Sequence, residues 1–208
     1  MDLVLASRNP HKTKEFRELL GTEFGLMDLT SFPEIAMPLE TGGTFNENAI
    51  LKATSVSKDV TAAAQLPRGS HLLVIADDSG LEVDALGDVP GTYSARYAGE
   101  NASDADNVNK LLRELRARNV QGNDRSARFR CVIALAQNGK LLGAFEGKVG
   151  GEILDLPRGT NGFGYDPVFQ PNGFEQTFAE MKLELKNKIS HRAKAVAALR
   201  EALRQVEN

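Results

Sequence analysis

Apolar residues form two short uninterrupted runs in the first half of the chain, Leu3 to Ala6 and Leu72 to Ala76, and a polar cluster follows each run. Short runs without polar alternation are typical of strands that are buried on both faces of an α/β sheet. We therefore expect two buried strands here, with the chemistry of the protein just beyond their ends.

Helical signals separate and follow these runs. The pattern from Thr44 to Glu47 fits a capping box and predicts a helix that continues to about Gln65. Ser103, followed by aspartates in the first turn, predicts a second helix that ends near Asn119. The stretch from Thr177 to Glu180 offers another capping box, and a final amphipathic helix follows Ser190.

A β-hairpin is predicted in the second half of the chain. Apolar and polar residues alternate from about 126 to 136, and Asn138-Gly139 supplies the positive φ values of a tight turn before a partner strand at 140–149. The seven glycines between Gly143 and Gly164 indicate a mobile or closely approached loop instead of a regular element. Together these patterns predict an α/β fold in which helices flank a mixed sheet.

Length and composition restrict the class of protein. The 208 residues are 41% hydrophobic and 25% charged, which is ordinary for a folded chain of one domain or of two tightly joined lobes. No repeat or long linker divides the chain, so we treat 1–208 as a single domain. Cys131 is the one cysteine, which excludes a disulfide within the chain and favours a reducing, cytoplasmic location. No apolar stretch approaches the roughly 18 residues of a membrane span, and the net charge of −3 argues against a nucleic-acid partner.

The first candidate binding segment, Ser7-Arg8-Asn9-Pro10-His11-Lys12, lies between the first strand and a helix-like run. A helix start exposes unpaired amides and a partial positive charge. With donors from Ser7, Asn9 and Lys12, such a start can cradle a phosphate. The alternative interpretation is structural: Asn9 caps the helix and Pro10 occupies its first position.

Carboxylates form the second candidate group. The segment 77–80, with sequence DDSG, follows the second apolar run, and adjacent carboxylates repel each other unless a cation or a proton lies beside them. Glu40 precedes a helix on which Asn48 and Lys52, four residues apart, share a face. Hard oxygen ligands suit Mg²⁺, which typically bridges a carboxylate to substrate phosphates. An aspartate-containing turn and a solvent-facing lysine are the alternatives.

Two further segments combine aromatic and basic residues. In Phe163-Gly164-Tyr165-Asp166 a ring is flanked by glycines, so a purine can stack on its face, although a core aromatic has the same pattern. Lys186 and Ser190-His191-Arg192 gather donors near a helix start, where they can bind phosphate or the carbonyl oxygens of a base. The alternative here is a capped helix with a surface histidine.

In this order the motifs resemble those of the inosine triphosphate pyrophosphatases, also called non-canonical purine nucleoside triphosphate pyrophosphatases or the Ham1-like family. The resemblance covers nearly the whole chain. Its most specific parts are residues 77–83 with Pro90-Gly91 and the 94–97 sequence SARY, then residues 162–169, then residues 190–192.

The resemblance implies a long mixed sheet with two lobes and a central substrate cleft, usually within a homodimer. It also implies Mg²⁺-dependent hydrolysis of ITP, dITP and XTP to the monophosphate and pyrophosphate, with Mn²⁺ as a substitute metal. Glu40 and Asp78 are implied as metal ligands, and Asp78 or Asp77 as the catalytic base. The residues implied in binding the purine nucleotide are Ser7, Arg8, Asn9, Lys12, Asn48, Lys52, Ser79, Phe163, Gly164, Tyr165, Asp166, Lys186, His191 and Arg192.

Departures from the family pattern are slight. Asn46 replaces a more usual acidic residue, and Asp88 replaces a common glycine. Two other functions stay open at this point. The related Maf-like pyrophosphatases hydrolyse other modified nucleotides, although the residues at 163–166 and 190–192 favour the Ham1-like group. A non-catalytic nucleotide-binding regulator is the second alternative, and the three carboxylates argue against it because binding alone does not need them.

Overall fold

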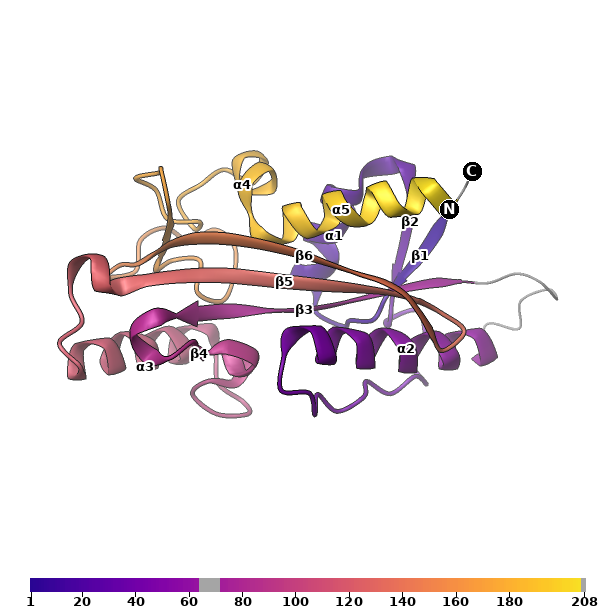
Figure 1. Ribbon diagram of the computed structural model, residues 1–208, viewed down its shortest axis with the longest axis horizontal. Helices are drawn as coiled ribbons and strands as arrows, with labels where there is room; N and C mark the ends of the chain where they lie inside the picture. The colour runs from indigo at the N-terminus through magenta and orange to yellow at the C-terminus, as the bar shows by residue number, and fades with distance from the viewer. Residues whose placement is uncertain (64–71, 207–208) are drawn as a thin grey trace. The chain divides into compact units, whose positions relative to one another are not determined.

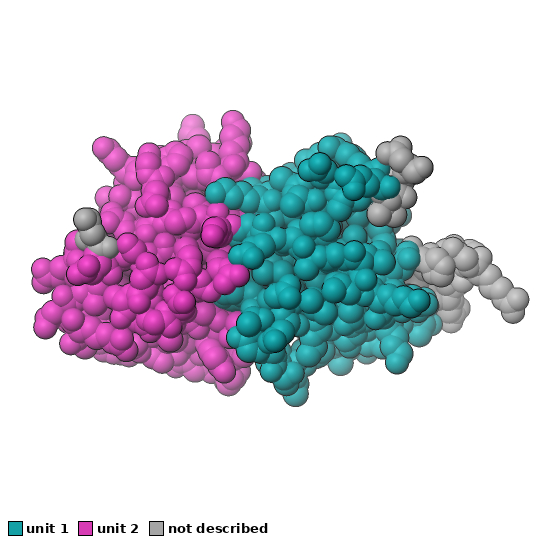
Figure 2. Space-filling view, viewed as in Figure 1, with its two compact units in different colours: residues 1–78, 131–147, 192–208 teal, residues 79–130, 148–191 magenta. Residues whose placement is uncertain are grey.

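The computed structural model describes residues 1–63 and 72–206, so Gln65, the expected end of one helix, lies outside the described residues. The chain divides into two compact units (Figure 2). Unit 1 consists of Met1–Asp78, Cys131–Gly147 and Arg192–Asn208, and unit 2 of Ser79–Arg130 and Lys148–His191. Three strands, β3 (Leu73–Val83), β5 (Ser126–Gln137) and β6 (Lys140–Ile153), contribute residues to both units.

Unit 1 contains the N-terminal strands and the helices around them (Figure 1). Besides its parts of β3, β5 and β6, its elements are β1 (Asp2–Leu5), α1 (Pro10–Leu20), η1 (Gly21–Glu23), β2 (Gly25–Asp28), α2 (Phe45–Ala63) and nearly all of α5 (His191–Val206). β1 lies between β2 and β3 and pairs in parallel with both, with Leu3 opposite Leu26 and Leu73. The two buried strands predicted from the apolar runs are confirmed.

Alternate residues of these strands pack against helices on opposite faces of the sheet. Leu3 and Leu5 belong to one core cluster with residues of α1 and α5, whereas Val4 and Ala6 belong to another with residues of α2. In Figure 1, α2 lies on the opposite side of the strands from α1 and α5. Because helices cover both faces, neighbouring strand residues are all apolar, which explains the uninterrupted runs.

Unit 2 is built around a single core cluster. Besides its parts of β3, β5 and β6, its elements are η2 (Asp84–Leu86), β4 (Val89–Pro90), η3 (Gly91–Arg96), α3 (Asp104–Ala117), η4 (Gly122–Arg125), β7 (Phe169–Pro171) and α4 (Leu183–Ile189). The cluster joins the leucines of α3 to a group of aromatic rings, in which Phe129 contacts Phe169 edge to face with centroids 4.7 Å apart. The predicted helix after Ser103 is α3, and Ser103 and Asp106 form its capping box.

The sheet is mixed, as predicted. Its strand order is β2-β1-β3-β5-β6-β7, with β4 beside β3, and β4 and β7 pair antiparallel to their neighbours. Asn138 and Gly139 have φ values of 48° and 78°, and a two-residue turn of this kind joins antiparallel strands. The predicted hairpin is therefore confirmed, and the partner strand is longer than expected.

Two expectations about local structure are wrong. The glycine-rich region is not loop from its start, because β6 continues through Gly151 to Ile153. A Cβ at Gly151 would lie 2.3 Å from the carbonyl oxygen of Gln170, so glycine there permits the close approach of β7. Thr177 and Glu180 make both hydrogen bonds of a capping box, yet they close a turn, and α4 begins only at Leu183.

The departure from the family pattern at Asp88 has a structural explanation. Its φ is 66°, in the left-handed region that glycine adopts freely and aspartate tolerates better than most residues. The Asp88 carboxylate accepts a hydrogen bond of 2.7 Å from Arg128.

None of the helices in the described residues combines the length and apolar character of a membrane span.

Candidate active site

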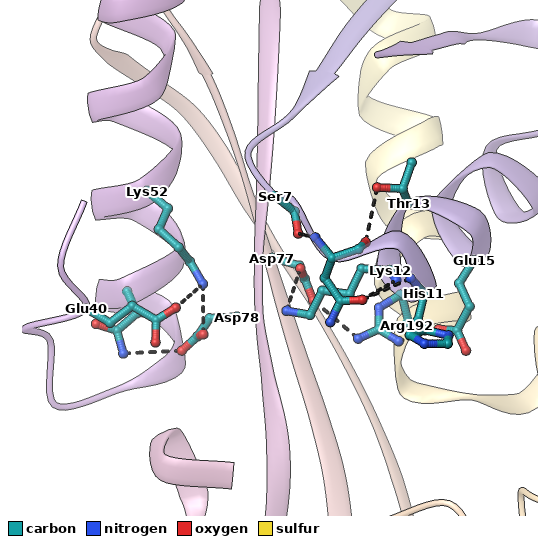
Figure 3. A network of polar contacts seen from close by, with 12 residues as sticks. Ser7, His11, Lys12, Thr13, Glu15, Glu40, Lys52, Asp77, Asp78 and Arg192 are labelled. Carbon is teal, nitrogen blue, oxygen red and sulfur yellow. Dashed lines mark hydrogen bonds and ion pairs between the residues drawn. The ribbon is translucent and has the colours of Figure 1, made fainter. Parts of the chain in front are cut away.

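Two adjacent aspartates lie within β3. The expectation that the segment 77–80 follows the end of the strand is wrong, because β3 continues to Val83. Successive residues of a strand point to opposite faces, and accordingly Asp77 and Asp78 contact different groups (Figure 3). Both are buried, with 2% and 5% exposure. The repulsion expected between neighbouring carboxylates is relieved because each has its own basic partner.

On one face, Asp78 meets residues of α2 and of the segment before it. Lys52 Nζ lies 2.9 Å from Asp78 Oδ1 and 2.8 Å from Glu40 Oε1. One helical turn earlier, the amide nitrogen of Asn48 donates to Asp78 Oδ2 at 3.2 Å, and its oxygen accepts from the backbone of Gly42 at 2.8 Å. The predicted shared helix face of Asn48 and Lys52 is therefore confirmed, and it faces a carboxylate instead of solvent.

Burial and charge act on this group in opposite directions. Burial raises the pKa of Asp78, and this effect exceeds the lowering by the adjacent Lys52. Burial by itself would lower the pKa of Lys52, but the negative charges of Asp78, Asp77 and Glu40 outweigh it, so the pKa is raised. Lys52 thus carries a proton at neutral pH, and Asp78 is more basic than an ordinary aspartate.

The donor set on this face suits a magnesium ion. Glu40 and Asp78 bind the same lysine nitrogen, which places two carboxylates side by side. Within residues 1–63 and 72–206, no three His, Cys, Asp or Glu side chains are grouped so as to hold a metal. Two carboxylates are sufficient for Mg²⁺, because this ion retains several waters and takes its remaining ligands from substrate phosphates.

On the other face, Asp77 lies between two basic side chains. Lys12 Nζ is 3.0 Å from its Oδ1, and a terminal guanidinium nitrogen of Arg192 is 3.3 Å from its Oδ2. Arg192, which is 2% exposed, also forms an ion pair with the buried Glu15. Glu15 is not among the predicted site residues, although its position three residues after Lys12 on α1 places both on one helix face.

The turn before α1 is organised by its own side chains. Ser7 Oγ accepts a hydrogen bond from the backbone of Asn9 at 3.1 Å, and Asn9 Oδ1 accepts from the amides of His11 and Lys12 at 2.9 and 3.3 Å. The capping interpretation of Asn9 is therefore confirmed. Arg8 donates to backbone carbonyls, at 2.7 Å in the case of Ile35.

In unit 2, a second group of charged side chains contacts Phe163, whose ring is predicted to stack on a base. Asp166 Oδ2 accepts from the Phe163 amide at 3.0 Å and from Lys186 Nζ at 2.7 Å. Lys186 Nζ lies 5.3 Å from the centre of the Phe163 ring, within cation–π range. Four of the predicted residues, including Gly164, are thus gathered in one loop and α4.

The remaining predicted residues serve packing as well. Tyr165 is 3% exposed and donates its hydroxyl to the carbonyl of Ser94 at 2.9 Å, so the core interpretation holds for this ring. His191 stacks on Phe129 with ring centroids 4.7 Å apart and is 4% exposed, which contradicts the alternative of a surface histidine. Ser79 is half-buried in β3.

Comparison with known proteins gives a consistent result. Residues 3–202 match the model of the Ham1 family. The chain is 47% identical to a dITP/XTP pyrophosphatase of Bacillus licheniformis, with 98% of both chains covered, and 48% identical to one of Geobacter sulfurreducens, with 97% of this chain and 96% of that protein covered. Among solved structures, a HAM1 protein from Coxiella burnetii matches with a TM-score of 0.84 and 42% identity over 99% of each chain.

Proposed function

This chain belongs to the Ham1 family, and from that premise we propose that it hydrolyses the non-canonical purine nucleotides ITP, dITP and XTP to the monophosphate and pyrophosphate. The observation that carries the proposal is the group of the buried Asp78 and Lys52 with the half-buried Glu40, which combines a basic carboxylate, a cation and a second carboxylate. A protein that only binds nucleotides does not need this combination. Removal of such nucleotides keeps damaged purines out of DNA and RNA.

The reaction assigns a distinct task to each side chain. Asp78 accepts the proton of a water that attacks the α-phosphorus, and the bond from this phosphorus to the oxygen bridging to the β-phosphorus breaks. Lys52 and Lys12 stabilise the negative charge on the departing pyrophosphate. Glu40 and Asp78 would hold Mg²⁺, which when bound neutralises charge on the triphosphate oxygens. Asp77, between Lys12 and Arg192, anchors Lys12.

Purine selection needs hydrogen-bond donors. Donors of His191 or Arg192, or loop amides, directed at a 6-oxo group would face the amino group of adenine in ATP, and sites of this kind reject a mismatch by about 10⁴-fold. GTP shares the 6-oxo group, so its exclusion depends on its 2-amino group. The Phe163 ring offers a face on which the base stacks.

We also propose that the enzyme is a homodimer, which light scattering after gel filtration tests.

The test is pyrophosphate release from ITP, dITP, XTP, dUTP, GTP and ATP with Mg²⁺, and again with EDTA. Release from ITP, dITP and XTP that EDTA abolishes, with little from ATP or GTP, supports the proposal. Release chiefly from dUTP would point to the Maf-like alternative, and tight ITP binding without release to a regulator.

The metal assignment has its own variant. Glu40→Gln is expected to raise the Mg²⁺ concentration for half-maximal activity at least about tenfold, because it removes one of the two carboxylates. The matched control is Asp59→Asn, which removes an exposed carboxylate from α2. An unchanged Mg²⁺ requirement in Glu40→Gln would contradict the assignment.

A further inference from the structure

A carboxylate from α3 reaches the loop 161–166 that carries the Phe163 ring. Asp104 Oδ2 accepts a hydrogen bond of 2.7 Å from the backbone nitrogen of Gly164, 60 residues further along the chain. A hydrogen bond of this length to a carboxylate is charge-assisted and stronger than a neutral one. α3 itself carries none of the residues that the sequence analysis assigned to nucleotide binding.

The helix does not need Asp104 for its own capping. Ser103 and Asp106 form a reciprocal capping box, in which Asp106 Oδ2 accepts from the Ser103 amide at 2.9 Å and Ser103 Oγ accepts from the Asp106 amide at 3.2 Å. Two of the orphan amides at the start of α3 are thereby satisfied. The Asp104 carboxylate is used to hold the loop.

Two carboxylates from different elements fix the backbone on both sides of Phe163. Its own amide donates to Asp166, and the next amide, that of Gly164, donates to Asp104. The loop is tight: a Cβ at Gly162 would lie 2.0 Å from the Asp166 carboxylate, and Gly164 has a φ of 63°. The direction in which the Phe163 ring projects beside Lys186 therefore depends on both carboxylates.

We infer that Asp104 is a positioning residue for nucleotide binding, which holds the Phe163–Gly164 peptide so that the Phe163 ring is preorganised to receive the purine. This inference rests on the proposed function. Without Asp104, water can satisfy the Gly164 amide, and the loop must be ordered at the moment of binding, which weakens affinity. The bond-breaking step depends on Asp78 in unit 1, so kcat is unaffected.

The kinetic test compares three variants with ITP as substrate. Asp104→Ala is expected to raise KM about fivefold with kcat within about twofold of the wild type, a change typical of lost ground-state binding. Asp104→Asn retains an oxygen acceptor and is expected to restore KM to within about twofold. The control Asp106→Ala removes the same charge from the same helical turn without touching Gly164, and its KM is expected to stay at the wild-type value.

A second readout is independent of turnover. The chain has no tryptophan, so Phe163→Trp introduces a single tryptophan at the ring position, whose emission can be excited separately from that of the tyrosines. Acrylamide quenching of this tryptophan is expected to increase at least about twofold when Asp104→Ala is added, and to stay unchanged when Asp106→Ala is added.

The outcomes separate the inference from the proposed function. If the wild type releases pyrophosphate and Asp104→Ala matches it in both KM and quenching, the inference is wrong and the function stands. Equal effects of Asp104→Ala and Asp106→Ala would also overturn the inference, because they would reflect helix charge alone. If the wild type releases no pyrophosphate, the function fails, and the quenching experiment decides on its own whether Asp104 orders the loop.

Discussion

The two faces of β3 carry neighbouring aspartates in different electrostatic settings. On the Asp77 face, the two carboxylates of Asp77 and Glu15 meet the two cations of Lys12 and Arg192, so the charges balance. On the Asp78 face, two carboxylates share one ammonium group, so one negative charge is in excess. Asp77 and Asp78 are neighbours in the same strand and point to opposite faces. The difference between the two faces therefore reflects the partners that each aspartate meets.

The difference in balance indicates a division of labour. An excess negative charge in a largely buried group is costly unless a cation joins it, and a divalent cation that also binds the substrate phosphates provides such a complement. A balanced group has no such need and is suited to holding elements together. We therefore expect substitutions on the Asp78 face to reduce turnover, and substitutions of the buried ion pair Arg192–Glu15 on the Asp77 face to reduce stability.

The largest effect is expected for Asp78→Asn. Loss of the general base should lower kcat about 10³-fold in the pyrophosphate assay, in the range that such groups contribute. Lys52 keeps Glu40 as a partner, so the melting temperature should change little. Asp59→Asn on α2 serves as the control with wild-type turnover. Turnover within about tenfold of the wild type would remove Asp78 from the mechanism.

Arg192→Met is expected to lower stability, an effect that is measured without substrate and so separately from purine selection. It leaves Asp77 and Glu15 buried with one cation fewer, and removal of one partner from a buried pair costs roughly 3 kcal/mol in the free energy of unfolding, measured by urea denaturation. Adding Glu15→Gln removes one of the stranded charges, so the double variant should be more stable than Arg192→Met alone. Additive losses in this double-mutant cycle would mean that the ion pair contributes nothing.

Much of this fold follows from local patterns in the sequence. The capping boxes at 44–47 and 103–106, the Asn138-Gly139 turn and the apolar runs depend on neighbours within a few residues, and the structure contains all of these features. The end of β3 was misjudged because Asp, Ser and Gly are typical turn residues. The alternation of Leu81, Glu82 and Val83 behind them was the signal that the strand continues.

The site was harder to predict because its contacts join distant parts of the chain. Arg192 and Glu15 are 177 residues apart, and no pattern within either segment indicates the other. The opposite directions of Asp77 and Asp78 follow at once from strand periodicity, but only when the strand is known to include them. Asp104 gave no signal, because an aspartate in the first turn of a helix is common for reasons of the helix dipole alone.

The smallest effect concerns a surface counterpart of the Asp77 group. Glu23 contacts Arg200 and Arg204 of α5, both at 2.8 Å, and its hydrogen bonds to Arg204 and then Arg200 lower its pKa from 4.5 to about 2. A carboxylate whose pKa is lower in the folded state stabilises that state fully above its unfolded value, and this contribution is lost as the pH falls from about 4.5 toward 2. Glu23→Gln should flatten the plot of unfolding free energy against pH within this window. At pH 7, Arg192→Met should lose as much stability in the Glu23→Gln background as it does in the wild type. Solvent and salt screen this exposed group, so 0.5 M salt should weaken the stability loss of Glu23→Gln far more than that of Arg192→Met. Urea denaturation at two salt concentrations therefore distinguishes a surface charge group from a buried one. Equal salt sensitivity of the two would contradict the assignment of the Asp77 group as a buried anchor.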